Sequence, residues 1–96
     1  MKEVVVVARV HARKEFAEDV LRELLALVEH ARSEEGCINY DLHRSADDPA
    51  LFMFYETWAS REDLDRHMDM PYLDDFDERT KGKLAKEVTV TFWEKL

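Results

Sequence analysis

The stretch that decides the fold runs from Ile38 to Trp58 and reads INYDLHRSADDPALFMFYETW. Its first part, Ile38–Arg44, alternates hydrophobic and polar residues, as a strand with one buried face does. Asp47-Asp48-Pro49 is typical of a turn, and Leu51–Trp58 is rich in strand-forming aromatic residues. We predict a hairpin of two strands, 38–44 and 51–58. One face of the first strand carries Ile38, Tyr40 and Leu42, and the other carries Cys37, Asn39, Asp41 and His43.

The residues before the hairpin predict a strand and then a helix. Val4–Val10 is a β-branched run with valines on both alternating faces, which indicates burial on both sides. From Lys14 to Ser33 the pattern becomes helical, and Gly36 is a suitable stop because glycine tolerates the left-handed conformation. The apolar stripe of this helix comprises Phe16, Val20, Leu24, Leu27, Val28 and Ala31, widened by Leu21 and Leu25.

The residues after the hairpin predict two short helices and a closing strand. Ser60 is a suitable N-cap, with acidic residues in the first turn behind it, and Pro71 begins a second helix. Glu87–Trp93 alternates again as a strand.

The resulting order, strand–helix–strand–strand–helix–strand, predicts an α+β ferredoxin-like βαββαβ fold with a four-stranded antiparallel sheet. We expect one domain over residues 1–96. The helix over 14–33 and the helical region after Ser60 would both pack on one sheet face. The other face would be bare and too apolar for water. A homodimer that pairs two sheets face to face would cover it.

Composition limits the partners. Acidic residues outnumber basic ones by 22 to 14, the formal charge is −8, and no basic stripe is present, so nucleic acid and membrane surfaces are not expected partners. The single cysteine, Cys37, suits a reducing compartment, and the N-terminal valine run is too short for a membrane span, so we expect a cytoplasmic protein.

Two residues are candidates for proton transfer. His67 follows Leu64 by three positions and should face the sheet, where it is either an acid/base or a hydrogen-bonded packing residue. Glu56 lies two residues from Trp58 on one strand face and should be paired or have a raised pKa. Glu56 could orient His67, accept a phenolic proton, or pair with Arg9 or Arg61.

Other residues are candidates for the walls of a pocket or for packing. Tyr40, Tyr72 and Phe76 could line an aromatic site, although each is individually more typical of a core or interface residue. Arg9 interrupts an apolar strand and could hold an anionic substrate oxygen or pair with an acid. Trp58 is a core aromatic by default.

Several site types are not expected. Cys37 lies beside Glu34 and Glu35, which disfavour a thiolate, so we reject it as a nucleophile. The four histidines lack tight ligand spacing, which argues against a metal site. Two glycines provide little for a phosphate-binding loop, so no nucleotide cofactor is expected.

The order and spacing of these residues resemble the antibiotic biosynthesis monooxygenase (ABM) domain family, in the subgroup similar to quinol monooxygenases. The resemblance covers nearly the whole chain. It rests on Ala8-Arg9-Val10, Leu27-Val28, Glu35-Gly36-Cys37, Tyr40-Asp41-Leu42-His43, Asp48-Pro49, Phe52, Tyr55-Glu56-Thr57-Trp58, Leu64, His67, Pro71 and Phe76.

The resemblance implies a dimeric α+β barrel and cofactor-independent oxygenation of a hydroquinone- or anthrone-like aromatic molecule by O₂. It implies His67 as acid/base, Glu56 as its orienting residue, and Trp58, Tyr72 and Phe76 as pocket walls. Lys14-Glu15 departs from the Pro-Gly that the family often has at the first helix. Ala8, His67 and Asp77 occupy the places of the haem-degrading branch's asparagine, tryptophan and histidine, which disfavours haem degradation.

Two further functions remain open at this stage. The chain could be a non-catalytic ligand-binding or stress-response module of the same fold, or a cofactor-free isomerase of a small carbonyl metabolite, because fold does not fix function.

Overall fold

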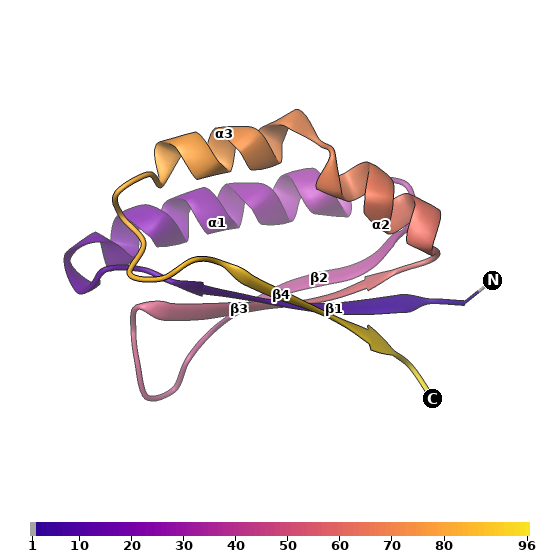
Figure 1. The fold of residues 1–96 in the computed structure, drawn as a ribbon, viewed down its shortest axis with the longest axis horizontal. Coiled ribbons are helices and arrows are strands. Elements are labelled where there is room, and N and C mark those ends of the chain that lie inside the picture. Colours follow the sequence, from indigo (N-terminus) through magenta and orange to yellow (C-terminus); the bar gives the residue numbers. More distant parts are fainter. Residues whose placement is uncertain (1) are drawn as a thin grey trace.

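The computed structural model describes residues 2–96 and contains one sheet with helices on one of its faces (Figure 1). A short 3₁₀ turn, η1 (Lys14–Phe16), precedes the first helix. The strands are β1 (Val4–His11), β2 (Cys37–Arg44), β3 (Leu51–Trp58) and β4 (Thr89–Glu94), and the helices are α1 (Ala17–Arg32), α2 (Arg61–Met68) and α3 (Pro71–Arg79).

The four strands are antiparallel in the order β2-β3-β1-β4. This arrangement confirms the predicted ferredoxin-like fold and the 51–58 strand, whereas the first helix begins later than predicted, after η1. In the centre of the sheet, Val6 pairs with Glu56 and Ala8 pairs with Phe54. Directly paired residues share a face, so this register places Glu56 on the helix-covered side.

α2 and α3 begin where local signals predicted, whereas α1 ends at Arg32, four residues before the predicted glycine stop. Gly36 has φ +90°, and a Cβ at this position would overlap the carboxylate of Asp63 on α2. Glycine is therefore required both by the backbone and by the close approach of α2. Ser60 caps α2 by accepting a hydrogen bond from the Asp63 backbone N–H at 3.2 Å, and Pro71 opens α3.

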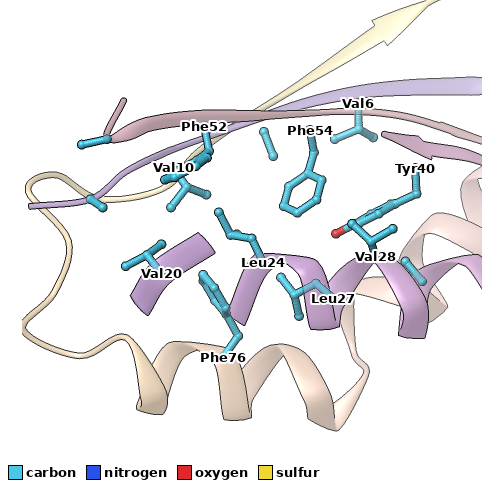
Figure 2. Close-up of a cluster of buried hydrophobic side chains, with 14 of the residues drawn as sticks. Val6, Val10, Val20, Leu24, Leu27, Val28, Tyr40, Phe52, Phe54 and Phe76 are labelled. Atoms are coloured by element: carbon cyan, nitrogen blue, oxygen red, sulfur yellow. The ribbon is translucent and has the colours of Figure 1, made fainter. Parts of the chain in front are cut away.

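The core fills the space between the sheet and the helices (Figure 2). α1 contributes the predicted stripe, of which Val20, Leu24 and Ala31 are fully buried. Leu25, which we expected to widen the stripe, is 51% exposed. The sheet contributes Phe52 and Phe54, whose rings point toward the helices in Figure 2.

One predicted register is wrong at the start of β2. Cys37 pairs with Trp58 and Asn39 with Thr57, so Ile38 is an extra residue in a β-bulge. The bulge places Cys37 against the core, and Ile38 is 52% exposed rather than beside Tyr40. Tyr40 and Leu42 face the helices as expected.

The second sheet face carries no helix (Figure 1). It combines apolar and polar groups: Val7 and Tyr55 lie opposite one another, and Arg9 lies opposite Met53. Tyr55 is 43% exposed and Trp93 is 57% exposed. Within residues 2–96, no helix has the length and apolar character needed to cross a membrane.

Candidate functional site

A cavity of about 140 Å³ lies between the helix-covered face of the sheet and the three helices. It opens past Met68, Val88 and Val90, which are all more than one-third exposed. Most of its lining is apolar: Val6, Ala8, Val10, Leu24, Leu27, Phe54, Leu64, Met68, Leu73, Phe76, Val88 and Val90. Such a lining suits a flat, largely apolar ligand.

Four titratable residues complete the lining: Tyr40 from β2, Glu56 from β3, His67 from α2 and Asp77 from α3. The first three are buried, and Asp77 lies exposed. No lysine or arginine is found among the lining residues within 2–96. The polar groups of the cavity are therefore hydroxyl, carboxyl and imidazole.

Glu56 is a buried carboxyl group that is held by the residue two positions along its strand. Its Oε1 accepts a hydrogen bond from Trp58 Nε1 at 3.0 Å. Burial raises the pKa of Glu56 from 4.5 to about 7; the Trp58 hydrogen bond opposes this shift and the nearby Glu34 adds to it. Glu56 can therefore exchange a proton near neutral pH.

His67 lies on the inner face of α2, one turn after the buried Leu64, and is 4% exposed. Its ring stacks on Trp58 with centroids 4.4 Å apart, and it meets the Tyr40 ring in an edge-to-face arrangement with centroids 5.6 Å apart. Its Nδ1 lies 2.9 Å from Glu34 Oε2. The orienting carboxylate of His67 is thus Glu34, and the prediction that Glu56 has this role is wrong because Glu56 bonds Trp58.

Tyr40 contributes a buried phenol to the cavity. Its ring tilts against Phe54 with centroids 4.6 Å apart. Burial, with a smaller contribution from Glu56, raises the pKa of Tyr40 far above its ordinary value. The hydroxyl therefore remains protonated and can donate a hydrogen bond to a ligand.

The seven predicted site residues separate into three groups. Tyr40, Glu56, His67 and Phe76 line the cavity together. Trp58 and Tyr72 do not line it: Trp58 is fully buried between Glu56 and His67, and Tyr72 bonds Glu34. Arg9 is exposed on the opposite sheet face, because it pairs with Met53 rather than with a core residue, and so it cannot reach a ligand in this cavity.

Residues 3–79 match the family described as antibiotic biosynthesis monooxygenase. The chain belongs to this family. This match confirms the family resemblance noted in the sequence.

Individual relatives agree with the family. The Mycobacterium tuberculosis protein named "Putative monooxygenase Rv0793" is 38% identical over 89 residues, which are 92% of this chain and 86% of that protein. Its solved structure superposes with a TM-score of 0.90 and 31% identity, covering 98% of this chain and 95% of that one. PA3566 from Pseudomonas aeruginosa superposes with a TM-score of 0.92 at 31% identity, covering 100% and 96%.

One relative is longer than this chain. The uncharacterized protein sll1783 of Synechocystis is 29% identical over 90 residues, which are 94% of this chain but 61% of that protein. The chain thus spans less than two-thirds of the length of that relative.

Glu34 is the site residue that sequence analysis of this ABM chain missed as a partner of His67. It follows α1, lies 33 positions before His67, and has a side chain only 10% exposed. The only sequence signal was its place in a run of two glutamates between the first helix and Gly36. Its approach to His67 depends on how α1 and α2 pack, which the sequence pattern does not specify.

The rejection of Cys37 as a nucleophile can be compared with the structure. Burial, followed by the charge of Glu34, raises the pKa of Cys37 to about 11, which agrees with its rejection as a nucleophile. Within residues 2–96, no group of three or more His, Cys, Asp or Glu residues is placed to hold a metal ion.

Proposed function

We propose that this ABM-family chain is a cofactor-independent monooxygenase that oxidises a small, uncharged hydroquinone in the cavity beside His67. The observation that carries the proposal is that Glu56 and His67, two groups able to move protons, meet in one otherwise apolar cavity. A base, a hydrogen-bond donor and a water-poor environment are what oxygenation of a phenol requires.

The cavity volume narrows the substrate class. An apolar cavity of about 150 Å³ holds one benzene ring, and this cavity measures about 140 Å³. A single-ring hydroquinone therefore fits, with a substituent projecting past Val88 and Val90. A three-ring anthrone would leave most of its surface outside, so the hydroquinone is the favoured class.

The charges of the lining residues restrict the substrate class further. Glu56 and Asp77 line the cavity, and no lining cation among the described residues opposes them. An aromatic carboxylate or phosphate would bring a like charge into this environment. We therefore expect neutral substrates to be favoured over anionic ones.

In the proposed mechanism His67 Nε2 removes the proton of one substrate hydroxyl, since Nδ1 already contacts Glu34. The phenolate passes one electron to O₂, giving a semiquinone and superoxide, which combine through a new carbon–oxygen bond. The peroxide anion takes the proton back from His67. The ring carbon then loses its hydrogen as a proton, the O–O bond breaks, and the departing hydroxide takes up a proton to form water. Hydroquinone and O₂ thus yield a hydroxyquinone and water, and the substrate supplies all the electrons.

Glu56 has a second proton-transfer role in this proposal. A carboxyl group with a pKa of about 7 can accept the ring proton in its ionised form. The Tyr40 hydroxyl donates to the oxyanion that forms on the substrate. Trp58 holds Glu56 in place through its indole N–H.

We further propose that a second copy of the chain covers the open sheet face. Val7, Tyr55 and Trp93 lie on this face, and the latter two are 43% and 57% exposed. Large exposed aromatic groups on a sheet face are typical of an interface. A face-to-face dimer would leave the cavity on the helix side accessible.

Oxygen uptake with a panel of hydroquinones and anthrones tests the proposal, with His67→Ala as the inactive variant. The control is Glu29→Ala, which alters an exposed residue of α1 that does not line the cavity. We expect turnover of neutral single-ring substrates that is lost in His67→Ala and kept in Glu29→Ala. Tight binding without oxygen uptake would instead indicate a binding module, and anaerobic deuterium exchange into a carbonyl compound would indicate an isomerase.

A further inference from the structure

Three helical segments meet outside the cavity, behind His67. Glu34, immediately after α1, receives the Tyr72 hydroxyl from α3 and lies 2.9 Å from His67 Nδ1 on α2. The Tyr72 hydroxyl is also 3.0 Å from the same Nδ1. We call Glu34 and Tyr72 the clamp.

We propose that the clamp is a positioning device that fixes the proton of His67 on Nδ1 and keeps Nε2 free to act as the base in the cavity. The inference rests on the proposed function and identifies two further residues for it. A carboxylate oxygen only accepts hydrogen bonds, so the nitrogen that contacts Glu34 must be the donor. In a neutral ring the other nitrogen then carries a lone pair.

Tyr72 fixes the carboxylate in turn. Burial raises the pKa of Tyr72 well above its ordinary value, and the hydrogen bond to Glu34 raises it further, so the hydroxyl stays protonated and donates. Its ring stacks on His30 with centroids 4.7 Å apart, which restricts its rotation. The Glu34 carboxylate is therefore held by one donor from α3 and one from α2.

Stability alone does not explain the contact between Glu34 and His67. Burying a carboxylate to this extent costs desolvation energy, and apolar side chains at such a position often give equal or greater stability. Trp58 stacks on one face of the His67 ring and so restricts its rotation further. Within residues 2–96, the titratable groups around His67 are Glu34, Tyr40, Glu56 and Tyr72, and of these only Glu34 and Tyr72 contact Nδ1.

Nitrogen-15 NMR of the histidine side chains reports the tautomer and tests the clamp without any turnover. In the wild-type protein we expect His67 to carry its neutral-form proton on Nδ1. Glu34→Ala should shift His67 toward the Nε2–H tautomer, whereas Glu34→Gln should largely retain Nδ1–H because the amide oxygen still accepts. A wild-type Nε2–H tautomer, or no change in Glu34→Ala, would overturn the proposal.

Kinetics provide the second measurement. If the hydroquinone activity exists, Glu34→Ala should lower kcat by about 10²-fold with little change in KM, and Glu34→Gln should recover part of the loss. Tyr72→Phe should give a smaller loss. A change in KM alone would contradict the clamp, whereas a wild-type protein without oxygen uptake would contradict the proposed function and leave the tautomer result to decide the clamp.

Discussion

Glu56 offers a direct measure of how strongly the cavity disfavours a charge. Its pKa is raised from 4.5 to about 7 by burial. The folded protein therefore holds the proton more tightly than the unfolded chain does. The stabilisation from this proton is fully present below pH 4.5, is lost as the pH rises toward about 7, and is absent above that.

The size of this change in the free energy of unfolding follows from the two pKa values of Glu56. Each pH unit of difference corresponds to about 1.4 kcal/mol, so the wild-type protein should lose about 3 kcal/mol across this window relative to Glu56→Gln. Glutamine has a similar shape, keeps an oxygen for the Trp58 indole and does not titrate. The free energy of unfolding of both proteins in urea, from pH 4.5 to 8 at constant protein concentration, measures the difference.

The control is Glu29→Gln, which alters an exposed glutamate on α1. The difference between this variant and the wild type should stay nearly constant with pH. If the Glu56→Gln difference were equally constant, Glu56 would not be desolvated in the folded protein. A raised pKa of Glu56 in the cavity, and with it the second proton-transfer role, would then be refuted.

Three further predictions concern the scaffold. Gly36→Ala should lower the free energy of unfolding by more than Gly82→Ala does. Both glycines have positive φ, which costs alanine about 1–2 kcal/mol, but a Cβ meets Asp63 only at Gly36. Equal losses would contradict the close approach of α2 to Gly36. Cys37, with a pKa of about 11, should be alkylated at pH 8 at least ~10-fold more slowly than free cysteine, as followed by mass spectrometry, and equal rates would contradict its burial. Tyr55→Asp should convert a dimer to monomers in sedimentation velocity while Tyr55→Phe remains a dimer, and a monomeric wild-type protein would contradict the proposed interface.

Periodicity was sufficient to predict most of the fold. The hairpin strands, the stripe of α1 and the starts of α2 and α3 each depend on residues close in sequence, such as Ser60 and Pro71, so a local pattern identifies them. The bulge at Ile38 was missed because one extra residue in a strand leaves no local mark in the pattern. It reverses the predicted face of Cys37.

The candidate site was predictable only in part, because its contacts join residues that are far apart in the sequence. The strand period places Glu56 on the inner face, and the helix period does the same for His67. Which groups contact each other depends on how separate elements pack: His67 meets Glu34 rather than Glu56, and Trp58 supports both residues from behind the cavity. The outward position of Arg9 was likewise decided by sheet register.

In the proposed function, a single-ring hydroquinone bound beside His67 gains one oxygen atom from O₂. Mass spectrometry of the product formed under ¹⁸O₂ tests this transfer. Wild-type protein and Glu29→Ala should give a hydroxyquinone with one ¹⁸O atom, and His67→Ala should give none above the uncatalysed background. Equal labelling in His67→Ala, or quinone formed without ¹⁸O, would contradict it.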